Sequence, residues 1–376
     1  MYKLAVQNVD IGLANAFKQE LAYNQEAHFE LDQSIKSIIT LYKIHWGVFD
    51  LIKVTSQIKK ESFQKWALIG GYNNQRPALY LQDKNRPLVV VGNTVISGNA
   101  SLPKSGIKRG NIAGHAFHGE QLIYGNINQS KSQLPGFSNT NYLKNIKENI
   151  YNNDSLEFIQ INEDQRLVNS FIKPTKIYRQ NKRIDLEYVQ LTGNFIIESD
   201  TLIRVHKTAV LQDIILIAPK IEIDEDVQGN FQAIATRKIE IGANSKLSYP
   251  TALLLIDENL LQTNSKKNIN QIVINDNVEV KGLVCYLSSD SKNNYQAQIK
   301  IEENANVIGE VYCNQNIELK GEVTGSVYTK GFIANQNGSV YQNHIYNGKI
   351  IVDDLPKQYS GFLFEGLPKQ IVQWVY

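Results

Sequence analysis

The sequence predicts a mainly β protein built around a parallel β-helix (solenoid), in which short strands stack coil upon coil. The first observation is an apolar–x–apolar dyad that returns along the second half of the chain. It occurs at residues 221–223, 239–241, 272–274, 299–301 and 317–319, with first residues 18, 33, 27 and 18 apart. Alternation at period two is typical of a strand with one buried face, and recurrence at tens of residues is typical of stacked coils.

The uneven spacing of the dyads fits a coil of about 18 residues that carries insertions at its corners. Polar tracts at residues 264–270 and 288–294 lie in the two longer gaps. Corner insertions leave stacked strands in register, so a solenoid accepts them on one face. We therefore expect these two tracts to leave the stack.

Composition sets the broad class of the protein. The 376 residues are 42% hydrophobic and 20% charged, which is typical of an ordered chain with a large core. The 39 basic and 37 acidic residues give a formal net charge of +2. So weak a balance gives no reason to expect nucleic acid or an anionic membrane as a partner.

Residues 1–87 are expected to form an N-terminal helix followed by an antiparallel β-meander. Within residues 1–24, apolar side chains recur at the spacing of one helix face: Val6, Val9, Leu13, Phe17 and Leu21. The short β-prone runs that follow are separated by polar turns, a pattern that favours hairpins. Because the helix begins abruptly, two interpretations stay open: an ordinary packing helix, or the soluble remainder of a longer anchored helix.

Residues 88–127 are rich in glycine, at intervals that suit tight corners between very short strands. We predict the first β-helix coils here, then a polar connection or excursion over residues 128–185 and the main β-helix over residues 186–350. Residues 351–376 are aromatic and apolar. They either cover the last coil as a C-terminal cap or dock on the strand edge of a partner.

The two cysteines are predicted to be free thiols. Aligning the glycines of neighbouring repeats places Cys285 beside Tyr312. The same alignment places Tyr286 beside Cys313. Neighbouring residues of a strand point to opposite faces, so the two sulfur atoms would lie on opposite sides of the sheet. Two cysteines also exclude a disulfide-stapled miniature fold and a multi-cysteine zinc site.

Residues 271–345 resemble the bactofilin family of bacterial polymer-forming proteins. The resemblance rests on glycine-punctuated valine repeats at residues 307–312, 319–328 and 338–341. It implies a right-handed parallel β-helix that assembles end to end without nucleotide, as filaments or membrane-associated sheets. The whole layout is also similar to envelope proteins of Bacteroidota-type bacteria, which carry a pilin-like N-terminal helix before a β-rich body.

Few residues suggest chemistry. His115 and His118 form the closest histidine pair, but at this spacing on a strand they point to opposite faces, and no third ligand is evident nearby. Asp224 opens an acidic run after a dyad, and with Asp213 one coil earlier it could form the acidic site of a polysaccharide enzyme. An exposed acidic corner is the alternative. We therefore assign no catalytic, cofactor-binding or metal-ligating residue and no cofactor.

Aromatic residues near the coil corners and in the C-terminal tail are the candidates for an interaction surface. On one flank of a solenoid they could bind sugar rings or a partner protein, or they could shield the face of the coils. The candidate interaction residues are Tyr286, Tyr312, Tyr328, Tyr341, Trp374 and Tyr376.

These features predict a non-catalytic structural or assembly component of the bacterial cell envelope, such as a pilus-like or surface scaffold. Its partners would be other envelope or assembly proteins, or further copies of itself, and not nucleic acid. Membrane contact would require an anchor absent from this chain, and the expected location is the cell envelope or surface. Two alternatives stay open: a β-helical carbohydrate-active enzyme or glycan-binding module, and a bactofilin-like cytoplasmic scaffold that polymerises.

Overall fold

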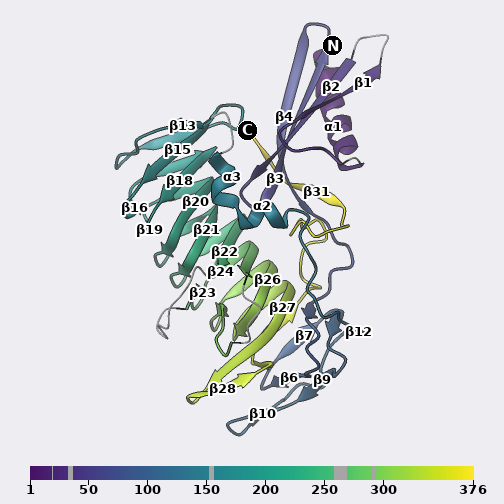
Figure 1. Cartoon of the computed structure of the whole chain (residues 1–376), viewed down its shortest axis with the longest axis vertical. Coiled ribbons are helices and arrows are strands. Elements are labelled where there is room, and N and C mark those ends of the chain that lie inside the picture. Colours follow the sequence, from purple (N-terminus) through teal and green to yellow (C-terminus); the bar gives the residue numbers. More distant parts are fainter. Residues whose placement is uncertain (19, 33–36, 152–155, 258–268, 290–293) are drawn as a thin grey trace.

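The computed structural model describes residues 1–18, 20–32, 37–151, 156–257, 269–289 and 294–376. Over these residues the protein is mainly β with three helices, which confirms the predicted class. Figure 1 shows two parts: a long column of parallel strands, and a helix on a twisted antiparallel sheet beside that column.

The N-terminal part is an antiparallel sheet with a helix on one face. Its strand order is β1-β2-β3-β4-β31. The strands are β1 (Glu26–Asp32), β2 (Ser37–Trp46), β3 (Phe49–Ile58), β4 (Glu61–Gly71) and β31 (Lys369–Val375). The helix α1 (Tyr2–Lys18) buries Val9 and Leu13 against Ile39. A Cβ atom at Gly12 would lie 2.7 Å from the Ile39 side chain, so glycine lets the helix approach the sheet closely.

The opposite face of this sheet packs on the column. Phe49 belongs to the same buried cluster as Ile215 of the column. The turn between β2 and β3 is fixed by the amide of Gln232, which also comes from the column. Its Oε1 accepts from the Val48 N–H at 2.7 Å, and its Nε2 donates to the Trp46 carbonyl at 3.1 Å. The two parts are therefore joined by packing and by specific hydrogen bonds.

The column begins in the middle of the sequence, and we call its parallel strands the parallel stack. The first are β13 (Leu156–Phe158), β14 (Arg166–Asn169), β15 (Thr175–Gln180), β16 (Ile184–Leu186), β17 (Gln190–Gly193), β18 (Phe195–Ser199) and β19 (Leu202–Val205). The longer strands are β20 (Val210–Ile223), β21 (Gln228–Ile241), β22 (Lys246–Asp257), β24 (Glu279–Ser288), β26 (Asn306–Leu319) and β27 (Glu322–Gln336), with the short β23 (Gln271–Ile274) and β25 (Ile299–Ile301) between them.

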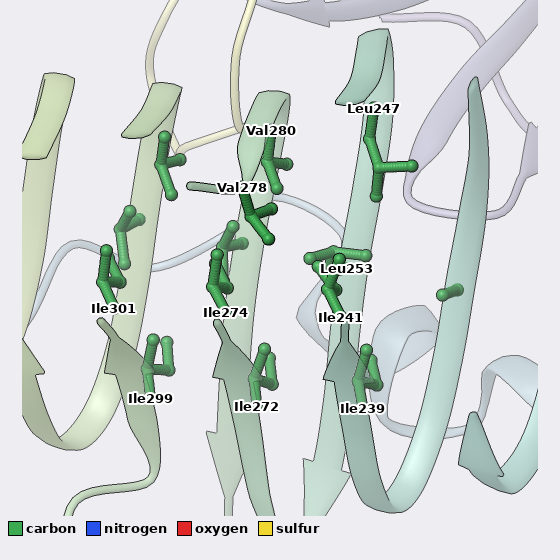
Figure 2. Close-up of a cluster of buried hydrophobic side chains, with 14 of the residues drawn as sticks. Ile239, Ile241, Leu247, Leu253, Ile272, Ile274, Val278, Val280, Ile299 and Ile301 are labelled. Carbon is green, nitrogen blue, oxygen red and sulfur yellow. The ribbon is translucent and has the colours of Figure 1, made fainter. Parts of the chain in front are cut away.

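The apolar dyads stack in register, as the sequence repeat predicts. Ile239 pairs with Ile272, which pairs with Ile299 in the next strand. Figure 2 shows these side chains as one buried row, with Ile241 and Ile274 in a second row beside it. Such ladders bury one face of every strand and form the core of the stack. The predicted insertions at residues 264–270 and 288–294 lie largely outside the described residues.

The register around the two cysteines is also the predicted one. Cys285 pairs with Tyr312, and Tyr286 pairs with Cys313. Both cysteines are free and buried. Because adjacent strand residues alternate sides, Cys313 joins the interior cluster of the stack and Cys285 joins the cluster on its outer face.

The glycine-rich coils near residue 88 do not form a separate first set. Instead, β27 pairs with β5 (Leu79–Leu81), β5 with β8 (Ala100–Leu102), and β8 with β12 (Ile127–Gln129). Likewise, β30 (Lys349–Ile351) pairs with β7 (Val95–Ser97). These N-terminal strands therefore extend the far end of the stack, and Figure 1 places β7 and β12 beyond β27. Short accessory strands surround them: β6 (Leu88–Val91), β9 (Ile107–Arg109), β10 (Asn111–Ile112), β11 (His115–Ala116), β28 (Ser339–Gln342) and β29 (His344–Tyr346).

The polar connection is shorter than expected. Strands β13 to β16, within residues 156–186, already belong to the stack. The apolar alternation of these strands is weak in the sequence, because none of them buries more than two side chains. Ile177 and Ile184 are examples of the buried ones. The connection that remains carries the helices α2 (Thr140–Lys144) and α3 (Ile146–Tyr151) along the column.

The C-terminal segment does not cap an end of the stack. Its last strand, β31, adds to the edge of β4 in the antiparallel sheet. Before that strand, Phe362 and Phe364 pack on the outer face of the stack around Phe137 and Tyr312. The edge of β4 and an apolar flank of the column are the surfaces on which the C-terminal segment packs. The segment therefore covers the side of the stack and not its end.

Candidate functional site

A groove of about 1150 Å³ lies between the far end of the stack and the C-terminal segment. One wall comes from residues 72–77, which precede β5, and another from residues 352–367. The floor is formed by strands β27, β5, β8 and β12. Three distant parts of the sequence therefore meet in this groove.

The floor of the groove is a ladder of side chains. Tyr328 pairs in register with Tyr80 on the next strand, and Tyr80 pairs with Ser101. Ser101 in turn pairs with Asn128 on β12. The rings of Tyr80 and Tyr328 are stacked, with centroids 6.4 Å apart and planes 27° from parallel. The ladder thus runs from an aromatic end to a polar end.

Two tyrosines of the groove are held firmly. The Tyr80 hydroxyl donates to the Gln133 carbonyl at 3.1 Å and accepts from the Lys131 N–H at 3.0 Å. Tyr124 is 42% exposed, and its backbone bonds to the strand that contains Ile96. A side chain at the following glycine would collide with the backbone of Gly98, so this stretch of chain lies close against the stack. These contacts fix the side chain of Tyr80 and the backbone of Tyr124.

The rim of the groove is rich in side-chain amides. The Asn73 Oδ1 accepts from the Gln75 N–H at 2.9 Å, and the Asn99 Oδ1 accepts from the Asn126 N–H at 3.1 Å. These bonds orient the two amides. Asn128 is exposed at the end of the ladder. The rim can therefore donate and accept hydrogen bonds in fixed directions.

A buried ion pair closes the base of one wall. The Arg76 Nε lies 2.8 Å from the Glu310 Oε1, and both side chains are almost wholly buried. Arg76 also donates to the Tyr359 carbonyl at 2.8 Å, and the Glu310 Oε2 accepts from the Phe362 N–H at 2.7 Å. Burial raises the pKa of Glu310, and the contacts with Arg76 and Phe362 offset only part of this effect.

A second charged cluster lies in the N-terminal sheet. The buried Asp50 carboxylate lies 3.3 Å from Lys43 Nζ, 3.2 Å from His45 Nδ1 and 3.6 Å from Lys369 Nζ. The Tyr23 hydroxyl donates to it at 2.9 Å. Burial would raise the pKa of Asp50, but the neighbouring cations and His45 outweigh burial and lower it. Burial lowers the pKa of Lys43 to about 8, although Asp50 acts in the opposite direction.

Beside this cluster lies a cavity of about 420 Å³. The ring of His45 stacks between Tyr23 and Tyr142, with centroids 3.8 Å and 3.6 Å away. A histidine–aspartate pair can activate a nucleophile, but among the described lining residues the aliphatic hydroxyl is that of Thr175. That hydroxyl is bonded to Asn194 at 2.9 Å. The cluster therefore ties together two strands and the C-terminal segment.

The predicted aromatic surface is not one exposed surface. Tyr286 points into the interior, where its hydroxyl donates to Asp257 at 2.6 Å. Tyr312 and Tyr328 point outward but are buried under the C-terminal segment. The other three residues lie elsewhere. Tyr341 on β28 and Trp374 on β31 are partly buried, and Tyr376, which follows β31, is 77% exposed.

The sequence reasoning missed Tyr72, Tyr80 and Tyr124, which line the groove. No local pattern marks these residues, because the pairing of β5 with β27 creates the groove. Of the six candidate interaction residues, Tyr328 alone lines the groove.

The acidic residues proposed for a polysaccharide enzyme have different partners. Asp213 is hydrogen-bonded to Asn230 and to Gln373, at 3.0 Å and 3.1 Å. Asp224 is paired with Arg204 at 2.7 Å and with His206 at 3.0 Å. Neither lines the groove.

His115 and His118 are not part of a metal site among the described residues. His115 lies near the Tyr346 ring, with centroids 5.9 Å apart. Among the described residues, no group of three or more histidine, cysteine or acidic side chains is arranged to hold a metal ion.

Comparison with known proteins adds no identification: no family model, curated protein or solved structure matches this chain. Within the described ranges, none of the helices has the length and apolar character needed to cross a membrane. The geometry of the groove and of the parts that enclose it is therefore the basis for a functional proposal.

Proposed function

We propose that this protein is a non-catalytic structural component of the bacterial cell envelope, which presents an extended binding surface on a right-handed β-helix. The coil-by-coil parallel register from β20 to β27 supports the β-helix. The right-handedness of the β-helix is inferred from the resemblance of the glycine repeats to bactofilins. The helix α1 on a sheet before a β-rich body is compatible with the pilin-like layout of Bacteroidota-type envelope proteins.

The observation that carries the proposal is the way in which distant segments lock the two parts into one body. The Arg76–Glu310 pair joins the start of β5, the stack and the C-terminal segment. Gln232 of the stack bonds to Val48 and Trp46 at the turn between β2 and β3 of the N-terminal sheet. Breaking a buried ion pair on one side leaves an uncompensated charge, so the Arg76–Glu310 pair disfavours arrangements in which these segments separate. A rigid body with a long groove suits a scaffold that holds partners at fixed positions.

The arrangement of the acidic residues favours binding over catalysis. Glycoside hydrolysis needs two carboxyl groups that flank one bond, about 5–9.5 Å apart. Asp213 and Asp224 each have their own hydrogen-bonding partners in different surroundings. A carbohydrate-active enzyme that uses this pair is therefore the weaker proposal.

Cell fractionation tests the proposed location. Antibody detection of the protein expressed from its natural gene should find it in the envelope or surface fraction. Other envelope or assembly proteins, recovered by cross-linking in intact cells, are the expected partners. Recovery of the protein in the cytosol would contradict the proposal and favour a cytoplasmic scaffold.

Self-assembly is a second candidate function, favoured by the uncovered end of the stack. Within the described residues, β13 pairs only with β15 and β14 only with β17. Phe158 and Val168 on these strands are 64% and 67% exposed. Unpaired edges with apolar side chains promote association between copies. Sedimentation velocity at rising concentration should then show polymers that Val168→Lys abolishes, and a monomer at all concentrations would exclude this function.

A further inference from the structure

We propose that the groove binds a neutral, extended polysaccharide, with successive pyranose rings lying across successive strands of its floor. This inference rests on the proposed function, because it names the ligand of an envelope scaffold. It is carried by the size of the groove, by the ladder in its floor and by the balance of its charges.

The groove has room for more than one ring. Its 1150 Å³ exceeds the roughly 300–1,000 Å³ of pockets that enclose drug-sized ligands. It is also built from three segments of chain that are fixed to one another by the Arg76–Glu310 pair. An oligomeric ligand fits a preformed site of this size better than a single small molecule does.

The floor repeats along the column. Tyr328, Tyr80, Ser101 and Asn128 occupy one register line on the neighbouring strands β27, β5, β8 and β12. Neighbouring strands lie about 4.8 Å apart. This spacing is close to the length of one unit in an extended pyranose chain. Tyr328 is buried, whereas Tyr80, Ser101 and Asn128 are partly or wholly exposed. A chain that lies along the column therefore meets one rung per sugar ring on β5, β8 and β12.

Tyrosines and amides have complementary roles toward a sugar. A tyrosine ring covers the apolar C–H face of a pyranose, while the sugar hydroxyls stay at the edges. Tyr80 and Tyr124 line the groove and are held by their own contacts. Amides both donate and accept hydrogen bonds, as hydroxyl groups do. Asn74, Asn99 and Asn128 bring such amides to the groove.

The charges of the groove favour a neutral ligand. Glu310 neutralises Arg76 inside the protein. The other charged lining residues are of both signs: Asp353, Lys357 and Glu365. A lining of mixed sign does not attract a highly charged polymer. The attraction must therefore come from ring stacking and hydrogen bonds.

Strand pairing argues against an extended peptide as the ligand. Extended peptides commonly bind by adding to an unpaired sheet edge. In the floor of the groove, β5 is paired on both sides with β27 and β8, and β8 is paired on both sides with β5 and β12. These two strands offer side chains only, which suits a sugar chain.

Isothermal titration calorimetry of the full chain with cellohexaose, mannohexaose and chitohexaose tests the proposal. We expect at least one of these extended β-linked chains to bind. Maltohexaose, whose α-linked chain curls, should bind more weakly than that ligand. Tyr124→Ala removes an exposed stacking ring and should weaken binding about tenfold or more. Tyr124→Phe keeps the ring and should bind like the unchanged protein.

A matched control separates loss of the site from loss of the fold. Tyr295 is also an exposed tyrosine, at 66%, but it lies outside the groove. Tyr295→Ala should bind the hexaose as the unchanged protein does. The proposal is overturned if none of the three extended hexaoses binds. It is also overturned if Tyr124→Ala binds equally well while its circular dichroism stays native.

Binding to purified envelope fragments distinguishes failure of this inference from failure of the proposed function. If Tyr124→Ala abolishes that binding and protease treatment of the fragments leaves it intact, both proposals stand. If protease treatment removes the binding, the partner is a protein, so the polysaccharide is excluded and the envelope function survives. If the unchanged protein does not bind the fragments, the proposed function itself fails.

Discussion

Arg76 and Glu310 form a buried ion pair, with 2.8 Å between Nε and Oε1, that joins three segments far apart in the sequence. Arg76 lies before β5, whereas Glu310 lies on β26 in the second half of the chain. The same two side chains hold the C-terminal segment through Tyr359 and Phe362. This charged contact is therefore one of those that hold the wall of the groove in place.

Removing one partner of this pair should be strongly destabilising. Arg76→Met leaves the Glu310 carboxylate buried without its cation, which typically costs about 3–5 kcal/mol. Urea unfolding followed by circular dichroism measures this loss. The double variant Arg76→Met/Glu310→Leu should lose less than the sum of the two single changes, because no unpaired charge remains.

An exposed pair provides the control. Arg183 and Asp185 are 2.6 Å apart, but both are largely exposed. Arg183→Ala should therefore leave the free energy of unfolding unchanged within error, as surface ion pairs contribute little. If Arg76→Met also left the free energy of unfolding unchanged, the Arg76–Glu310 pair would not be what holds the C-terminal segment in place.

Lys43 predicts a specific dependence of stability on pH. Burial lowers its pKa to about 8, whereas the unfolded chain has the usual value of about 10.4. Between these values the unfolded state binds more protons than the folded state, so the Lys43 contribution to stability rises with pH. The stability of the unchanged protein relative to Lys43→Met should therefore increase from pH 7.5 to pH 9.5. A constant difference would mean that Lys43 titrates normally in the folded state.

Gly325 should tolerate no side chain. Its φ is +149°, and a Cβ atom there would overlap the carbonyl oxygen of Gly309 on the preceding strand. Gly325→Ala should thus disrupt the stack and yield protein without a cooperative thermal transition. Gly338, with φ +77° and open space around it, is the matched control. Gly338→Ala should cost only the backbone strain of about 1–2 kcal/mol.

The buried thiols should be almost inert in the folded protein. Burial raises the pKa of Cys313 to about 12 and that of Cys285 well above its usual value. Only the thiolate reacts, so alkylation by iodoacetamide at pH 8 should be about a thousandfold slower than in the unfolded chain. Mass spectrometry of the labelled protein, with and without urea, measures the difference. Rapid labelling of one cysteine in the folded state would show that its environment opens.

The parts of the fold that the sequence predicts are those with a local repeat. The ladder of Ile239, Ile272 and Ile299 follows from period-two alternation within each coil and from the length of the coil. The pairing of Cys285 with Tyr312 follows from the same repeat, anchored on glycines. Stacking in register makes these contacts a property of neighbouring coils, so a pattern along the chain is sufficient.

The groove could not be predicted in this way. Tyr80 meets Tyr328 only because β5 pairs with β27 of the stack, and nothing in the three residues of β5 specifies that partner. Tyr312 and Tyr328 alternate outward as expected for a surface. They are buried because Phe362 and Phe364 return to cover them. Contacts between distant segments depend on the whole chain, and a single sequence gives no local signal for them.

The pairing of β5 with β27 also constrains the order in which the protein can fold. During synthesis, residue 79 leaves the ribosome long before its partner at residue 327 exists. The strands from β13 onward can join one after another, whereas the glycine-rich coils must wait with unpaired edges. Closing so long a loop is slow, because its entropy is lost before the contacts form. The chain is therefore most exposed to aggregation, and most dependent on chaperones, while the strands of its N-terminal third still lack their partners.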